Sequence, residues 1–443
     1  MRPLLLVLAA LTVVAGWSSP LPGGAQGISV RSQSVQNQFP EGAVFNLLVG
    51  ADSPVAEVRL HYAIQTPDSS RAIGQPECNE GRVVQCSFDL RSTAGTFLVP
   101  KTDISYWWEV RDEAGNALET EPETFTYEDD RFRWDSRTEA NLTVWYYKAD
   151  EQEVLDLLRV GRETLDGMGA LLGTRVEFPV KVLYYASAAD MQPAVLSQEL
   201  APEGGPVTLG EVVYSDTAVV SRDVVPLDIL RHELTHIVVR EAVKGPFGEP
   251  PAWLDEGTAV YAQSRPLSDE QQALDLAISR DRVLSVRSLT SSSLARSDNV
   301  SLFYGQSHSI VAFLIETYGE EKFRQLFAVF RDGATTDQAL ETVYGFDQDG
   351  LEDAWRESVG LPPREPPTSP NGGQSQPIPK LTPFGAEEGQ QAPQEPEGGG
   401  STAPSAAEES DGFPVVAVVV VLAVTVLLAG GIAAGGLLIL RRR

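Results

Sequence analysis

Positive charge, histidine and cysteine are all scarce in this chain of 443 residues. Lysine and arginine number 34 against 62 aspartates and glutamates, which gives a formal net charge of −28. The basic residues form no stripe before the extreme C-terminus, whereas nucleic acids and anionic lipids bind to such stripes. The composition therefore predicts no nucleic-acid partner. With only four histidines and two cysteines, the positions of these residues become informative.

The two cysteines, Cys78 and Cys86, lie in the segment "ECNEGRVVQCSF", where strand-forming residues flank a glycine turn. In an oxidising compartment we expect them to close a small hairpin disulfide. Nothing in their spacing indicates a metal site or redox catalysis.

The N-terminal residues have the features of a secretory signal peptide, which we place at residues 1–25. Arg2 precedes an apolar stretch that is too short for a comfortable membrane span, and the small residues at 23–25 offer a cleavage site. We therefore expect the chain to be exported.

A second apolar run covers residues 413–440 and contains no charged residue. It exceeds the roughly 20 residues that cross a bilayer as a helix. A buried core helix would show a periodic polar face, which this run lacks. Three arginines follow as a cytoplasmic tail at 441–443, and positive clusters stay on the cytoplasmic side. The sequence thus predicts a single-pass protein of the cell membrane, with its N-terminal ectodomain outside the cell.

Residues 27–130 show short strand patterns separated by glycine, proline, aspartate and asparagine. Such a pattern predicts an all-β sandwich of immunoglobulin or fibronectin type. The region contains no cluster of catalytic residue types, so we expect it to act as a spacer or a recognition domain. His61 falls in one of its strands and is expected to be structural.

Residues 135–360 change to a mixture of α and β patterns. Two strand patterns, "NLTVWYYK" and "VEFPVKVLYYAS", flank an amphipathic helix, and "TLGEVVYSDTAVVS" predicts a further strand or hairpin. The remainder of this region is nearly all helical in pattern. Residues 361–411 are rich in proline, glycine, glutamine, serine and glutamate, which predicts a disordered stalk between this domain and the membrane.

The segment "ILRHELTHIVV" places two of the four histidines four residues apart in an apolar run. Pro226 suits the first turn of a helix, and leucines and isoleucine recur at helical spacing until Gly245 and Pro246. Residues four apart lie on one side of a helix, so His232 and His236 can bind a single metal ion. The alternative is that both are hydrogen-bonded core histidines.

A second helix is predicted in "EPPAWLDEGTAVYAQSRP", and its Glu256 is a candidate third ligand. Two histidines and one glutamate form a recognised ligand set for catalytic zinc, which keeps a fourth position for water. Glu256 could instead be a surface charge of the helix, but it follows an apolar Trp-Leu pair. The combination favours one zinc ion per chain.

At these residues the sequence resembles the gluzincin zinc metallopeptidases, the clan of thermolysin and aminopeptidase N. "HELTH" is followed twenty residues after His236 by Glu256 in "WLDEG", and the segments after residue 300 resemble the helical part of the peptidase-MA-like family. The resemblance covers residues 140–360 and implies an α+β gluzincin-type domain. It matches His232, His236 and Glu256 to the zinc ligands.

The same resemblance implies the catalytic roles. Glu233 matches the general base, and Tyr304 in "FYGQS" matches the tyrosine that steadies the oxyanion. Asp255 matches a polar partner of a ligand histidine. His308, one turn beyond Tyr304, is a second candidate for the oxyanion, and Tyr304 could instead be a buried aromatic. The chain lacks the Gly-x-Met-Glu-Asn motif of the aminopeptidases, so exopeptidase specificity is not supported.

Two functions of different class follow. The first is a membrane-anchored extracellular zinc metallopeptidase that hydrolyses a peptide or protein substrate, with Glu233 as the general base. The second is a surface binding or adhesion protein whose metallopeptidase-like domain is a weak or inactive scaffold. Retention of Glu233 favours the enzyme, because zinc bound only for stability needs no base. The cleaved bond and the oligomeric state are not specified by the sequence.

Overall fold

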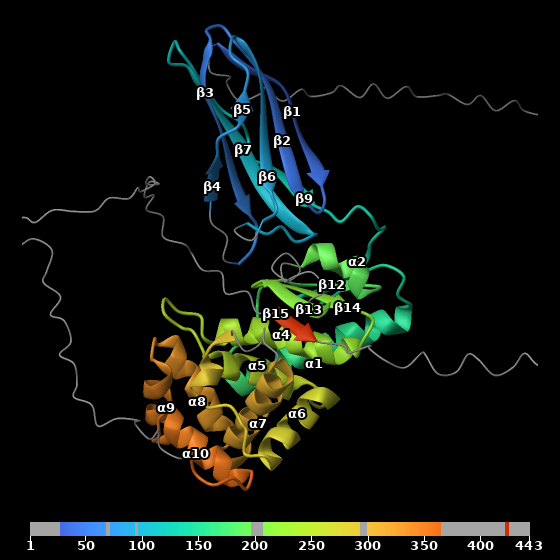
Figure 1. The fold of residues 1–443 in the computed structure, drawn as a ribbon. Helices are drawn as coiled ribbons and strands as arrows, with labels where there is room; N and C mark the ends of the chain where they lie inside the picture. Colours follow the sequence, from blue (N-terminus) through green and yellow to red (C-terminus); the bar gives the residue numbers. More distant parts are fainter. Residues whose placement is uncertain are drawn as a thin grey trace, which may run out of the picture.

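The computed structural model describes residues 27–67, 71–93, 96–195, 207–292, 299–364 and 421–424. Over these residues the chain forms a β-rich region, drawn in blue at the top of Figure 1, and a larger part in which helices pack with a separate six-stranded sheet. The predicted β-rich front region followed by a helical domain is therefore confirmed. The immunoglobulin-like assignment of the front region stays a prediction.

The β-rich region consists of two antiparallel sheets that enclose a common core. Alternation explains the burial: in "GAVFNLLVGA" the side chains of Phe45, Leu47 and Val49 point inward and are fully buried. Cys78 and Cys86 are paired across two strands and form the predicted disulfide. The first sheet has the strand order β1 (Ile28–Gln38), β2 (Gly42–Ala51), β6 (Val83–Arg91) and β5 (Glu77–Cys78). The second has the order β4 (Arg71–Gly74), β3 (Val55–Ile64), β7 (Thr102–Asp112) and β8 (Ala117–Glu119), and β9 (Glu123–Tyr127) also pairs with β7.

The larger part begins with a six-stranded sheet. Its strand order is β10 (Asp135–Glu139), β11 (Leu142–Tyr146), β12 (Val180–Tyr185), β14 (Thr217–Ser221), β13 (Val207–Tyr214) and β15 (Val421–Val424). β11, β12 and β14 run parallel, and the β13–β14 hairpin is the one that the sequence predicts. Helix α1 (Glu151–Leu172) connects β11 to β12 and packs on helix α4 (Pro226–Ala242). Gly161 of α1 makes this contact close, since a Cβ there would lie 2.6 Å from Leu142 and 3.2 Å from Leu234.

The rest of the larger part is helical, as predicted. Helix α5 (Ala252–Ala262) packs on α4 and on α7 (Val300–Tyr318), which in turn packs on α6 (Ser268–Ser279). The remaining elements are α2 (Ala188–Met191), η1 (Gln192–Ala194), η2 (Ser288–Thr290), α8 (Glu320–Arg331), α9 (Thr336–Tyr344) and α10 (Gln348–Ser358). In Figure 1 helices α9 and α10 lie at the lower, orange end of the molecule.

An aromatic cluster joins the two parts. Val99 and Phe39 of the front region pack with Tyr147, Leu183 and Tyr185 of the larger part. Because side chains alternate along a strand, these residues lie on the sheet face opposite to α1 and α4. The front region thus packs on one face of the six-stranded sheet, and helix α4 lies on the other face.

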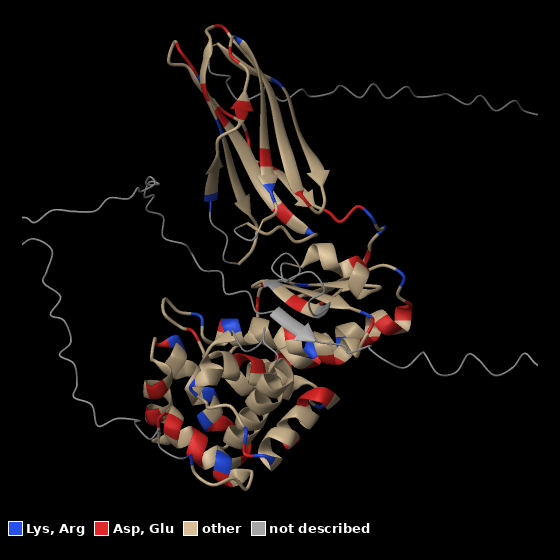
Figure 2. Cartoon of the chain, in the orientation of Figure 1, with Lys and Arg blue, Asp and Glu red and all other residues tan. Residues whose placement is uncertain are grey.

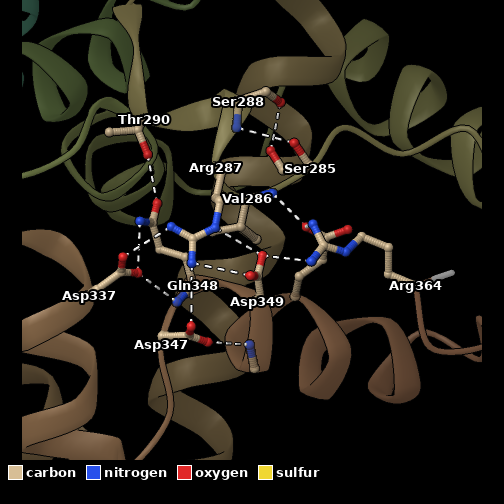
Figure 3. Close-up of polar contacts among 12 residues, drawn as sticks. Ser285, Val286, Arg287, Ser288, Thr290, Asp337, Asp347, Gln348, Asp349 and Arg364 are labelled. Carbon is tan, nitrogen blue, oxygen red and sulfur yellow. Dashed lines mark hydrogen bonds and ion pairs between the residues drawn. The ribbon is translucent and has the colours of Figure 1, made fainter. Parts of the chain in front are cut away.

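A network of ion pairs fixes the segment after α6 to the last helices (Figure 3). The guanidinium of Arg287 lies 3.0 Å from Asp337, 3.3 Å from Asp347 and 3.0 Å from Asp349. The same segment makes two hydrogen bonds with α7. The backbone N–H of Leu284 donates to Gln306 Oε1, and the Leu284 carbonyl accepts from Gln306 Nε2. This segment therefore ties α7 to α9 and α10.

Several predictions fall on residues outside the described part of the chain. They include the signal peptide at 1–25, nearly all of the stalk at 361–411 and the tail at 441–443. Of the predicted membrane helix at 413–440 only Val421–Val424 is described, as strand β15 beside β13. Within the described residues, no helix has both the length and the apolar character required to cross a bilayer. The membrane span stays a prediction.

Over the described residues, Figure 2 shows lysine and arginine scattered among aspartate and glutamate on both parts of the molecule. The predicted lack of a basic stripe agrees with this distribution.

Candidate metal centre

Helix α4 carries three of the candidate residues. Pro226 occupies the first helical turn, where its missing N–H costs nothing, and the helix continues to Ala242. The apolar face predicted from the sequence is in the core, since Leu230, Leu234 and Ile237 are fully buried. His232, Glu233 and His236 are also buried, at 1% exposure or less. Burial of three ionisable side chains on one helix demands partners for them.

Helix α5 brings the fourth candidate, Glu256, which is only 3% exposed. It is therefore not a surface charge. Helix α5 lies close to α7 because the residue after Glu256 is Gly257. A Cβ at Gly257 would lie 2.4 Å from the carbonyl oxygen of Ser307. Trp253 and Val260 are buried beside it, as the sequence predicts.

The three predicted ligands converge. Their ligand atoms all lie within 4.8 Å of one another. Glu256 Oε2 is 3.3 Å from His232 Nε2 and 3.5 Å from His236 Nε2. All three atoms are buried, and none has a hydrogen-bond partner among the described residues. Buried polar atoms rarely lack partners, so this set fits a cation that would be bound between them.

Each histidine is oriented through its other ring nitrogen. His236 Nδ1 lies 2.9 Å from Asp255 Oδ1, which is the partner that the resemblance implies. His232 Nδ1 lies 2.9 Å from the side-chain amide of Gln263. Both contacts leave Nε2 directed at Glu256, as metal-binding histidines require.

Gln263 is a residue that the sequence analysis missed. It follows Glu256 by seven residues at the end of α5, and residues seven apart lie on the same face of a helix. That spacing was the available signal. Its Oε1 has no hydrogen-bond partner among the described residues, so rotating the amide by 180° would let this oxygen accept a hydrogen bond from Nδ1–H of His232. The Nε2 lone pair of His232 would then be free for a metal.

The electrostatics of the cluster reflect its burial. Burial raises the pKa of Glu256 to about 8. For His236 burial acts to lower the pKa, but the charges of Asp255 and Glu256 outweigh it and raise the pKa to about 9. Burial lowers the pKa of His232 well below its ordinary value, and the charge of the nearby His236 lowers it further. Without a metal, each group of the His236–Glu256 pair therefore retains a proton at neutral pH.

Glu233 lies on α4 between the two histidines, and burial raises its pKa to about 8. Its Oε1 is buried and has no hydrogen-bond partner among the described residues. A carboxylate with such a pKa can accept a proton near neutral pH, which is the property required of a general base.

The structure separates the two candidates on α7. The Tyr304 ring is buried, with its centroid 6.2 Å from that of His232. Burial, followed by the charge of Glu256, raises the pKa of Tyr304 well above its ordinary value, so the hydroxyl keeps its proton. His308 instead lies against Tyr261, with ring centroids 6.3 Å apart. Tyr304 is thus the side chain of α7 that reaches the histidine pair.

Together, the fold and the cluster define a metallopeptidase-like domain. A family model described as the peptidase MA superfamily matches residues 161–360, a range that includes all three candidate ligands and Glu233. This part of the chain is similar to that superfamily, and the predicted resemblance is confirmed.

Other comparisons add little. One solved structure that the chain is similar to is the crystal structure of a carbohydrate-binding module family 56 β-1,3-glucan binding domain. The identity is 17%, the match covers 21% of this chain and 95% of that one, and the TM-score is 0.14. A likeness this weak supports no conclusion. No curated protein matches the chain.

Proposed function

We propose that this protein is a membrane-anchored extracellular zinc metallopeptidase. The observation that carries the proposal is the convergence of three buried, unpartnered ligand atoms, those of His232, His236 and Glu256, beside the buried carboxylate of Glu233. Members of the peptidase MA superfamily are typically zinc-dependent, and the ligand set suits zinc. The substrate class is a peptide or a protein.

The chain's own residues supply the remaining chemistry. A zinc ion at this site would act as a Lewis acid and make a water molecule more acidic. Glu233 takes the proton of the attacking water and later delivers it to the leaving amine. Tyr304, which stays protonated, donates a hydrogen bond to the oxygen that becomes negative when the carbonyl carbon turns tetrahedral. Asp255 and Gln263 keep the two imidazoles in orientation.

The location is proposed from the sequence at the two ends of the chain. An exported N-terminus, an apolar run at 413–440 and the arginines at 441–443 support an ectodomain outside the cell and a single membrane anchor. The disulfide between Cys78 and Cys86 is consistent with an oxidising compartment.

The test uses the full-length protein and a mixed peptide library, with bound zinc measured in parallel. We expect one zinc per chain and cleavage by the wild type, and the same zinc content but at least about 100-fold slower cleavage by Glu233→Gln. Glu163→Gln is the matched control, because Glu163 is exposed on α1. Zinc in every variant with cleavage in none would support the alternative of a binding protein with an inactive scaffold.

A further inference from the structure

Strand β13 approaches the proposed general base through a residue without a side chain. Gly210 and Val212 are two apart on this strand, so they face the same side, toward α4. An ideal Cβ placed on Gly210 would lie 2.8 Å from Glu233 Oε1 and 3.0 Å from Glu233 Cγ. It would also lie 2.4 Å from Cγ2 of Ile229, one turn earlier on α4. The space that a side chain would occupy is therefore the space beside the carboxylate.

The same strand holds the other side of that carboxylate. The backbone N–H of Val212 donates a hydrogen bond to Glu233. Because Oε1 has no hydrogen-bond partner, the bond goes to the other oxygen. β13 thus holds one oxygen of the base and, at Gly210, leaves room beside the other, which is buried.

Backbone conformation does not explain the glycine. Gly210 is not among the residues with positive φ, and glycine in the interior of a strand is less favourable than alanine. What Gly210 provides is room. We propose that Gly210 is a positioning residue: its missing side chain allows the Glu233 carboxylate to lie against β13 with Oε1 directed at the reacting water. This inference rests on the proposed function and assigns a role to a residue outside the zinc-binding motif.

Alanine at position 210 would displace side chains and not backbone. The nearest atoms belong to two side chains, Glu233 and Ile229, rather than to backbone. Glu233 can change its rotamer, whereas the β-branched Ile229 is stiff at χ1 and has to shift slightly. Gly257 is different, because its Cβ would meet the backbone of Ser307. We therefore expect Gly210→Ala to move the carboxylate while the fold and the three ligands stay in place. The effect should fall on turnover and not on metal binding.

The experiment compares kcat, KM, zinc content and thermal unfolding for the full-length wild type and Gly210→Ala. We expect kcat to fall at least about tenfold, with KM and zinc per chain close to those of the wild type. The contact with Ile229 should lower the unfolding midpoint without changing metal binding. Gly167→Ala is the matched control, since a Cβ at this position of α1 meets nothing within 4 Å.

Two further variants separate positioning from packing. Ile229→Ala, added to Gly210→Ala, removes the contact with Ile229 and leaves the contact with Glu233; activity should stay low, and its recovery would overturn the proposal. Glu233→Asp retracts the carboxylate by one methylene, so Gly210→Ala should cost much less in that background than in the wild type.

The outcomes also distinguish this inference from the function on which it rests. A wild type that cleaves, a Glu233→Gln variant that does not and a fully active Gly210→Ala variant would overturn the role of Gly210 alone. Equal activity of wild type and Glu233→Gln would overturn the proposed function, and the positioning role with it.

Discussion

The two parts of the chain each bring histidine and glutamate together, but in opposite ways. In the β-rich region His61 lies 3.1 Å from Glu109 and stacks on Trp107 with its ring centroid 5.0 Å away. Glu109 also accepts a hydrogen bond from Arg111, and this bond, together with that of His61, lowers the pKa of Glu109. Every charge in this group faces an opposite charge or a ring.

On α4 and α5 the pattern is reversed. Nε2 of His232, Nε2 of His236 and Oε2 of Glu256 have no hydrogen-bond partner, and the pKa of Glu256 is raised to about 8. Burial of both kinds is unfavourable unless it is compensated. In the β-rich region the compensation is within the protein, whereas on α4 and α5 a bound cation would supply it. The comparison indicates that buried charges with hydrogen-bond partners stabilise the fold, whereas buried charges without them indicate a candidate functional site.

The largest expected effect comes from removing a ligand. Glu256→Gln keeps the shape of the side chain and removes its charge, so zinc affinity should fall more than about 100-fold and peptide cleavage should be lost. Competition with a chromophoric chelator measures the affinity. Glu109→Gln, the matched change in the β-rich region, should leave zinc affinity unchanged; equal effects of the two substitutions would erase the contrast between the regions.

Removing an orienting partner should have a smaller effect. Asp255→Asn and Gln263→Leu are each expected to weaken zinc binding about 10- to 100-fold, because each frees one imidazole to rotate. The loss should be larger for Asp255, which is the charged partner. If Gln263→Leu binds zinc as tightly as the wild type, the contact with His232 is packing and not orientation.

Zinc binding should depend on pH through the His236–Glu256 pair. Their pKa values are raised to about 9 and about 8, so each group of the metal-free pair holds a proton at pH 7 that zinc must displace. Apparent affinity should therefore rise by up to about 100-fold per pH unit below pH 8, by about tenfold per unit between pH 8 and 9, and level off above pH 9. Calorimetry in buffers of different ionisation enthalpy would detect the released protons; an affinity independent of pH would contradict the raised pKa values.

How much of this was predictable follows from the range of the interactions. The helices that carry His232, His236 and Glu256 were predicted because capping residues and apolar spacing are local signals. The β13–β14 hairpin was equally visible. Gln263 was missed because its role depends on a neighbouring helix. Its spacing of seven from Glu256 places it on the same helix face but does not identify His232 as its partner.

Gly210 was beyond sequence reasoning for a similar reason. A glycine in a strand usually indicates a bulge or a close approach, but which atom approaches it depends on how α4 packs on β13. Tyr304 and His308 were also indistinguishable by sequence, since both lie on one helix one turn apart. Only the packing of α7 on α5, which itself packs on α4, places Tyr304, and not His308, beside His232.

Packing around the site can be tested without touching a ligand. Gly257→Ala places a methyl group 2.4 Å from the Ser307 carbonyl oxygen, which is backbone and cannot rotate away. We expect a loss of about 1 to 3 kcal/mol in the free energy of unfolding, seen as a lower thermal midpoint. Gly167→Ala, in open space on α1, should not lower the midpoint. An unchanged midpoint for Gly257→Ala would mean that α5 and α7 can separate at no cost.

The smallest effect is expected at His61, and it tests the comparison most directly. His61→Gln keeps a donor for Glu109 but loses the stacking on Trp107, so unfolding should become easier by about 1 kcal/mol or less. The two parts meet on the sheet face opposite to α4, which leaves the site outside the reach of this change. Zinc affinity and kcat should therefore equal those of the wild type. A change in either would mean that the β-rich region and the metal site are coupled, and that the charges of the two regions cannot be treated as independent.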